Sequence, residues 1–178
     1  MASRRVRTAG LAAGAMAAVA GTTVVAPPAH AYSNEWTMVT EVNTSTCASK
    51  GDRVARKVTG GCYLADSADN TFFQTDKGGT AIKVEVYTGT TLRGKLEFHP
   101  YSEKVWLYDT SNDGETIYAD VWANGKQRIM ATPGSSKKIE YDIEDLSVDE
   151  GNAVALEVYD GYSEWGGVDL ISKKNGWA

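Results

Sequence analysis

The chain has 178 residues, a formal net charge of −5, and only 2 cysteines and 2 histidines. An acidic protein is repelled by phosphate backbones and by anionic lipid surfaces, so we expect neither nucleic acid nor a membrane as partner. The few cysteines and histidines also leave little material for a metal centre or for nucleophilic catalysis.

The first 31 residues have the pattern of a secretory signal peptide. Three arginines precede a stretch rich in Ala, Gly and Val, and the small residues of Ala29-His30-Ala31 fit a cleavage site. A transmembrane anchor is the alternative, but it needs about 20 strongly apolar residues, and this stretch is weakly hydrophobic and contains Thr22 and Thr23. We therefore predict a secreted, extracellular protein whose mature chain begins at Tyr32.

The export route and the mature composition follow from the same segment. Ser3-Arg4-Arg5 fits twin-arginine export, whereas Arg7 and Thr8 stand where apolar residues are expected, so general secretion stays open as well. Cleavage leaves 147 residues, enough for one domain with a hydrophobic core. The removed segment holds 3 basic and no acidic residues, so the net charge of the mature chain is −8.

The mature N-terminus, residues 32–46, alternates like a β-strand but has no obvious partner strand in the sequence. Trp36, Met38 and Val42 line one side of it. Such a segment can add to the sheet edge of another protein, where main-chain hydrogen bonds supply affinity, or it can fold back onto its own sheet. The first alternative makes these three residues the candidate partner-binding residues.

Cys47 and Cys62 are predicted to form a disulfide. An isolated pair of cysteines in an oxidising compartment is expected to pair, whereas a zinc site needs more ligands than these two and His99 supply. A redox pair would lie closer together in the sequence. The surrounding residues 46–76 are rich in Gly, Ser, Thr and Asp, which predicts a long loop pinned by the disulfide.

From residue 81 onward the sequence alternates with a period of two between turn signals, which is typical of half-buried antiparallel strands. Residues 82–86 and 92–98 predict a hairpin with one face on a core, and Asn124-Gly125 predicts a second hairpin that pairs Ala123 with Lys126. Further strands are expected at 104–109, 116–123, 126–132, 137–144, 154–158 and 168–172. The whole pattern predicts an all-β chain, folded as one antiparallel β-sandwich of about seven to nine strands over residues 32–178.

Two resemblances arise in the C-terminal half of the chain. The run Val105-Trp106-Leu107-Tyr108-Asp109-Thr110 with Asp113-Gly114 resembles a pattern of small secreted actinobacterial proteins of unassigned function, and Val158-Tyr159-Asp160-Gly161 fits the same picture. The chain also resembles the small linker subunits of actinobacterial umbrella toxin particles, which join larger subunits without catalysis. That resemblance implies an adaptor subunit in an extracellular complex used between bacteria.

The residues that could carry catalysis are few. His99, the only histidine of the mature chain, would have to act as the general base of any Ser/His/Asp arrangement, and no GxSxG segment accompanies it. A histidine directly before Pro100 at a strand end is more often a surface residue. Two carboxylates would suffice for a glycosidase, but so acidic a chain brings some pair together in any fold. We therefore predict no enzymatic activity.

A short acidic run resembles the start of a calcium loop. Asp109, Ser111, Asp113 and Glu115 alternate, and Gly114 stands where such a loop turns sharply. The twelfth position, normally a bidentate glutamate, is Asp120 and falls in a predicted strand. The same residue types make ordinary hairpin turns, so we prefer a turn and predict no cofactor, with calcium as the alternative.

Four aromatic residues pair up on two predicted strands. Trp106 and Tyr108 share one face, and Tyr118 and Trp122 share another. If buried, they belong to the core of the sandwich, which is the interpretation we favour. If exposed, Trp106, Tyr108 and Trp122 form a stacking surface for a polysaccharide, because aromatic rings offer apolar faces to sugar rings.

These observations predict a secreted, noncatalytic protein-interaction module, an adaptor for other secreted proteins in a toxin-like complex. The alternative is a carbohydrate-binding module for an extracellular polysaccharide.

Overall fold

A computed structural model describes residues 32, 34–111, 113–133, 139–163 and 166–178, without the side chains of 162–174. Over these residues the chain consists of β-strands and one short 3₁₀ turn at Pro100–Ser102. The strands form an antiparallel sandwich that is nearly closed, which confirms the predicted fold class.

The described residues form thirteen strands, more than the seven to nine predicted, because the segment around the disulfide contributes four short ones. In chain order the strands are β1 Glu35–Asn43, β2 Ser49–Gly51, β3 Arg56–Val58, β4 Gly61–Leu64, β5 Thr71–Gln74, β6 Thr80–Thr88, β7 Thr91–His99, β8 Lys104–Asp109, β9 Tyr118–Ala123, β10 Lys126–Ala131, β11 Glu140–Asp145, β12 Ala153–Ser163 and β13 Gly166–Trp177.

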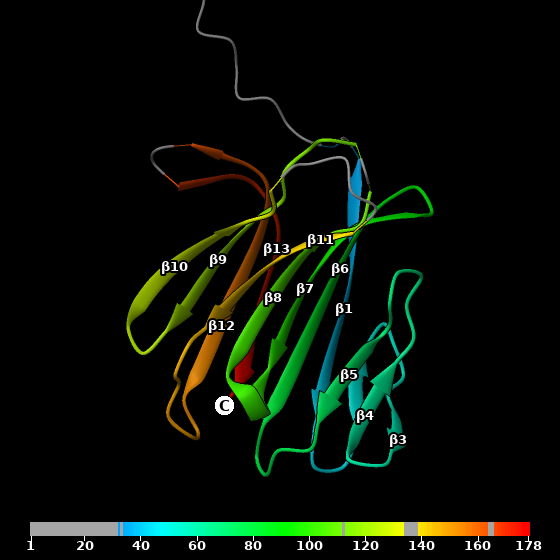
Figure 1. Cartoon of the computed structure of the whole chain (residues 1–178), viewed down its shortest axis with the longest axis vertical. Helices are drawn as coiled ribbons and strands as arrows, with labels where there is room; N and C mark the ends of the chain where they lie inside the picture. Colours follow the sequence, from blue (N-terminus) through cyan, green and yellow to red (C-terminus); the bar gives the residue numbers. More distant parts are fainter. Residues whose placement is uncertain (1–31, 33, 112, 134–138, 164–165) are drawn as a thin grey trace, which may run out of the picture.

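The large sheet bends into two layers (Figure 1). One layer contains β1, β6, β7, β8 and β11, and the other contains β10, β9, β12 and β13. The layers join where Trp177 of β13 pairs with Thr80 of β6. At the opposite side Arg128 of β10 forms an ion pair with Glu144 of β11, which links the two ends of the sheet.

The hydrophobic core lies between the two layers. Period-two alternation sends Ile82, Val84 and Val86 of β6 inward, and Val154, Leu156 and Val158 of β12 meet them from the other layer. The second predicted hairpin is confirmed, since Ala123 pairs with Lys126 across a turn in which Asn124 and Gly125 have φ of 51° and 71°.

Gly94 in β7 permits one close contact inside this core. A Cβ atom there would lie 2.1 Å from Cδ1 of Ile117 and 2.6 Å from the carbonyl oxygen of Tyr108. Ile117 is fully buried just before β9, so the glycine makes room for a side chain from the other layer.

The segment 46–76 is not simply the predicted loop. It holds β2, which pairs with β1, and a separate small sheet in the order β3-β4-β5. The predicted disulfide between Cys47 and Cys62 is confirmed. A second apolar cluster packs around it and joins the small sheet to β1 and β6; its buried members are Val42, Cys47, Cys62, Leu64, Phe73 and Ala81.

The hairpin of β6 and β7 is buried on both faces, whereas its alternation predicted half-buried strands. Lys83, Glu85, Lys95 and Glu97 point away from the main core, yet each is at most 2% exposed. The chain from Arg53 to Gln74, which we call the covering segment, lies over them, so the face that should meet water is covered.

The N-terminal segment folds back onto its own sheet, which is one of the two alternatives left open by the sequence, because β1 pairs with β6 along its whole length. Two other elements differ from expectation. β13 is longer than the expected strand at 168–172. The predicted strand 137–144 begins outside the described residues, and its described part, β11, exposes Tyr141 and Ile143 while Glu140 is buried.

The disulfide should stabilise this arrangement measurably. Its two cysteines are 15 residues apart, and closing a loop of this length contributes about 3 kcal/mol in the chain-entropy model. We expect the double variant Cys47→Ala, Cys62→Ala to lose about that much free energy of unfolding in urea titrations. An unchanged free energy would mean that the small sheet holds its place without the bond.

Candidate functional site

Three aromatic side chains gather on the outer side of β8 and β11, and we call them the aromatic face. Trp106 and Tyr108 are two residues apart in β8, and Tyr141 of β11 pairs directly opposite Tyr108. The rings of Trp106 and Tyr108 are nearly parallel with centroids 6.0 Å apart, and Tyr141 lies 5.5 Å from Trp106 and 5.9 Å from Tyr108.

The aromatic face lies at the surface, with its deepest ring nearly covered. Tyr141 is 55% exposed, Trp106 is partly exposed, and Tyr108 is 8% exposed at the base. The preferred interpretation of these aromatics as sandwich core is therefore wrong. Their side of β8 is the outer one, and Val105 and Leu107 supply the inner side.

Trp122, the third predicted carbohydrate-binding residue, belongs to a different surface. It is 43% exposed on the outer side of β9, in the other layer of the sandwich. Its strand neighbour Tyr118 lies on the same side. The structure thus brings Trp106 and Tyr108 together, adds Tyr141, and leaves Trp122 apart.

A pocket of about 250 Å³ lies at one end of the aromatic face. Thr110 follows Tyr108 by two residues and Ile139 precedes Tyr141 by two, so the pocket continues the same two rows of side chains. Its other walls come from the loop before β5 and from the hairpin between β6 and β7. Four of the seven lining residues carry a hydroxyl group and three are apolar: Ser67, Thr90, Thr91, Thr110, Ala68, Leu92 and Ile139.

A largely buried set of charged side chains lies beside the aromatic face, between the small sheet and the outer side of β6 and β7. We call it the ion network; its members are Arg53, Asp66, Asp69, Lys83, Glu85, Lys95 and Glu97. The covering segment supplies Arg53, Asp66 and Asp69, and β6 and β7 supply the rest. Each ion pair across this boundary therefore fastens the segment to the sheet.

Lys95 connects the ion network to the aromatic face. Its fully buried ammonium group lies 3.1 Å from Asp66, 2.9 Å from Glu97 and within contact of Asp69. The same Nζ atom lies 4.4 Å from the ring centroid of Tyr108. A desolvated ammonium over an aromatic ring is attracted by its π-electrons, so Lys95 fixes the ring from below.

Asp66 organises the covering segment as well as the charges. Its Oδ2 pairs with both Lys83 and Lys95, and its Oδ1 accepts hydrogen bonds from the backbone N–H groups of Ala68, Asp69 and Asn70. A second carboxylate, Glu85, forms a two-pronged contact with Arg53 at 2.9 and 3.0 Å. The buried charges are thus both paired and hydrogen-bonded, as burial requires.

Burial alone would raise the pKa of Asp66, but the hydrogen bond and charge of Lys83, together with Lys95, hold it well below its usual value. Burial would also raise the pKa of Glu97, but the hydrogen bond with His99 and the charge of Lys95 outweigh it, so the pKa is lowered. A lowered folded-state pKa adds stability above the unfolded value of about 4, and this stability is lost as the pH falls below it.

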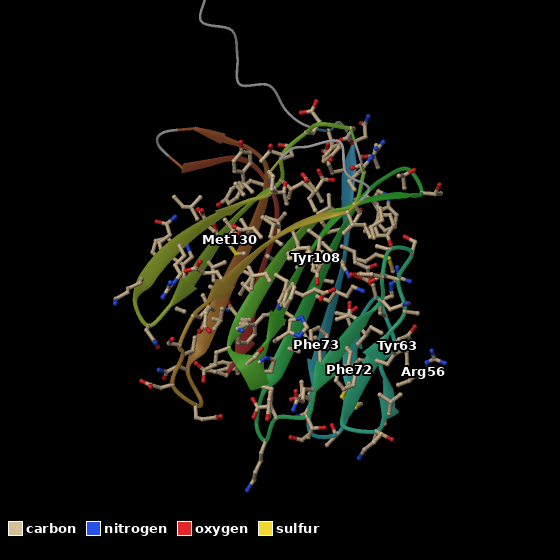
Figure 2. All side chains as sticks on the ribbon, viewed as in Figure 1. Arg56, Tyr63, Phe72, Phe73, Tyr108 and Met130 are labelled. Carbon is tan, nitrogen blue, oxygen red and sulfur yellow. A yellow bond between two sulfur atoms is a disulfide. The ribbon has the colours of Figure 1, made fainter. Side chains whose placement is uncertain are left out.

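His99 supports the aromatic face from the side. Its Nε2 lies 3.1 Å from Oε2 of Glu97, and its ring lies between Phe73 of β5 and Trp106, with centroids 4.8 and 6.2 Å away. In Figure 2 Phe73 lies on the side of the small sheet toward Tyr108, whereas Tyr63 and Arg56 lie farther from it. Burial and the charge of Glu97 raise the pKa of Tyr108, so its hydroxyl stays protonated and can donate.

The residues of the candidate calcium loop make turn contacts. Oδ1 of Asp109 accepts from the Ser111 N–H at 2.9 Å, and Oδ1 of Asp113 accepts from the Glu115 N–H at 3.1 Å. Asp113 also lies 3.3 Å from Arg93. Within the described part of the chain, no three His, Cys, Asp or Glu side chains are grouped so that they could hold a metal ion. The preference for a turn over a calcium loop stays a prediction.

The candidate partner-binding residues of β1 have different surroundings. Val42 is fully buried beneath the small sheet, so it cannot touch a partner in this fold. Met38 is half-buried. Trp36 is 45% exposed, stacks on Tyr87 at 4.6 Å and donates from Nε1 to the carbonyl oxygen of Gly89 at 2.8 Å.

Two carboxylates come together on the outer side of the layer formed by β10, β9, β12 and β13. Asp120 of β9 pairs directly with Glu157 of β12. Burial and the nearby charge of Glu157 raise the pKa of Asp120, although a hydrogen bond from Gln127 acts in the opposite direction. The pair lies on the layer that carries Trp122, away from the aromatic face.

Tyr141, Lys95 and Asp66 were not predicted from the sequence as members of a site. The alternation of Ile139, Tyr141 and Ile143 did place these side chains on one face, and that is the only signal for Tyr141. No sequence signal points to Lys95 or Asp66, because their contact joins segments that are 29 residues apart.

No known protein family and no curated protein matches the sequence. Over the described residues, no helix is long and apolar enough to cross a membrane. The likeness to secreted actinobacterial proteins therefore stays a prediction, and the functional argument rests on the site itself.

Removing the charge of Asp66 tests the ion network. Asp66→Asn leaves two buried ammonium groups short of a partner, and we expect a loss of about 3–5 kcal/mol in the free energy of unfolding at pH 7. The loss should shrink as the pH falls below about 4, because Asp66 of the unfolded wild-type chain then takes up a proton while folded Asp66 stays charged, which removes its contribution to stability. Urea titrations at pH 7 and pH 3 measure both effects.

Asp69→Asn is the matched control, because the Asp69 side chain is 41% exposed and pairs only with Lys95. It should lose about 1 kcal/mol or less. Equal losses in the two variants at pH 7 would contradict a buried network centred on Asp66.

Proposed function

We propose that this protein is a secreted, noncatalytic binding module and that its aromatic face holds an extracellular polysaccharide. The observation that carries the proposal is the juxtaposition of Trp106, Tyr108 and Tyr141 on one outer sheet surface. Secretion is supported by the signal-peptide pattern and agrees with the disulfide.

The surroundings of the aromatic face favour a sugar over a purely apolar ligand. A sugar ring has an apolar face that packs on aromatic rings and a rim of hydroxyl groups that need hydrogen-bond partners. The aromatic face offers the first, and the adjoining pocket offers Ser67, Thr90 and Thr110 for the second. Lys95 holds the ring of Tyr108 and His99 packs beside Trp106, so little side-chain entropy of these two rings is lost on binding.

Binding to insoluble chitin and insoluble cellulose tests this function. We expect at least one of these polysaccharides to retain the protein, and Tyr141→Ala and Trp106→Ala each to weaken retention about tenfold or more, as loss of a central aromatic does in other interfaces. Tyr141 is 55% exposed on an edge strand, so its variant should keep the fold. Depletion isotherms measure the affinities.

Trp122→Ala is the matched control, because Trp122 is a similarly exposed aromatic on the other layer. Its affinity should equal that of the wild type. Retention by neither polysaccharide, or an equal loss in the Trp122 variant, would contradict binding at the aromatic face.

An adaptor role is the second candidate function, and a free sheet edge favours it. Within the described residues, no strand pairs with β1 between Glu35 and Met38 on the side away from β6. An open edge can accept a strand from another secreted protein, and Trp36 lies beside it at the surface. Such a partner would occupy β1 without touching the aromatic face.

A proline on this edge separates the two candidates. The N–H and C=O groups of Val39 point away from β6 and bond Asp52, so Thr37, two residues earlier, presents its N–H on the same side. We expect Thr37→Pro to abolish capture of a partner from culture supernatant by the immobilised protein, while polysaccharide binding persists. Thr37→Val keeps the N–H and is the control; capture that survives the proline would exclude strand addition here.

A further inference from the structure

Tyr32 is held firmly at one end of the sandwich. Its side chain is 9% exposed, and its hydroxyl lies 3.0 Å from Oγ of Ser111 and 3.5 Å from Oδ1 of Asp113, in the loop after β8. The guanidinium of Arg93 lies 5.4 Å from the ring centroid, from the side of β7. Three contacts from two elements therefore fix one residue that precedes the first strand.

The main-chain nitrogen of Tyr32 points at a buried carboxylate. It donates to Oδ2 of Asp160, 3.3 Å away, and Asp160 in β12 is 1% exposed. Asp109, another carboxylate at this end, is also 1% exposed, and it raises the pKa of the Tyr32 hydroxyl, as Asp113 does, although burial is the main cause. A buried carboxylate is stabilised far more by a cation than by an amide dipole.

The same nitrogen is the one that signal-peptide cleavage would set free. Tyr32 directly follows Ala29-His30-Ala31, the predicted cleavage site. Hydrolysis of the Ala31–Tyr32 peptide bond by an export signal peptidase consumes one water, leaves a carboxylate on Ala31 and turns the Tyr32 amide nitrogen into an ammonium group. An α-ammonium is charged at neutral pH and has three donors where the amide has one.

We propose that the α-ammonium of Tyr32, released by cleavage after Ala31, forms a buried ion pair with Asp160 and locks this end of the sandwich. The lock joins the start of the mature chain to β12 through the ion pair and to the loop after β8 through the Tyr32 hydroxyl. Ser111 in that loop follows Thr110, which lines the pocket beside the aromatic face. Processing would thus complete the wall of the binding site. The inference rests on the proposed secretion but not on polysaccharide binding.

Four proteins test the lock: chains that begin at Tyr32 or at Ala31, each with Asp160 or with Asp160→Asn. One extra residue moves the ammonium away by about 3.8 Å and restores the amide at Tyr32. We expect the chain that begins at Tyr32 to melt about 5 °C or more above the chain that begins at Ala31. With Asp160→Asn this difference should vanish, whereas the exposed control Asp149→Asn should preserve it.

Equal melting temperatures for the two Asp160 chains would overturn the lock, and so would a difference that survives Asp160→Asn. If the Asp160→Asn chains do not fold, the comparison of the two Asp160 chains still decides. The mass of the exported protein tests the cleavage position separately. A mature chain that begins at any residue other than Tyr32 overturns the lock. Polysaccharide retention of the Tyr32 chain reports on the proposed function independently of either result.

Discussion

The position of Lys95 is the constraint on which the rest of the site depends. Its ammonium group is fully buried, so it is tolerable only where carboxylates surround it. Glu97 comes from its own strand, but Asp66 and Asp69 come from the covering segment. The segment must therefore close over β7 for the charge to be satisfied, and closure also seals Lys83 and brings Ser67 to the pocket. The ring of Tyr108 lies against the same ammonium group, so the segment that satisfies the charge of Lys95 also supports the aromatic face.

An ion network is not the most stabilising filling for such a boundary, since apolar side chains of similar volume often do better. The apolar cluster around Phe73 and the disulfide already holds the small sheet against the main sheet. What the charges add is direction: Arg53 meets Glu85 with both prongs, and Asp66 must reach two ammonium groups at once. Apolar contact tolerates sliding, whereas these pairs hold only in one register. We infer that the network sets the position of the covering segment more than its stability.

The sequence predicted those parts of the fold that local patterns encode. Alternation over 82–98, the Asn124-Gly125 turn and the two cysteines predicted the central hairpin, the second hairpin and the disulfide. The prediction failed where the residues that bury a surface are distant in the sequence. Lys83 and Glu85 alternate with Ile82 and Val84 as in a solvated face, and nothing near them shows that residues 53–74 will cover them. The prediction that the aromatics lie in the core failed for a related reason. Alternation groups Trp106 with Tyr108 on one side of a strand, but only the packing of the two layers decides which side is the interior.

The two ends of the aromatic face are then built differently, and this bears on how it could act. At one end the support is the ion network, whose Lys95 lies against Tyr108, and His99 and Phe73 pack beside Trp106. At the pocket end the support is the loop after β8, where Ser111 and Asp113 contact Tyr32 and Arg93. The first support consists of residues within the sheets and the segment fastened to them. The second reaches the chain immediately before β1, so its geometry depends on how that chain begins. A ligand that stacks on the rings alone would respond to the network, whereas one that also enters the pocket would respond to both supports.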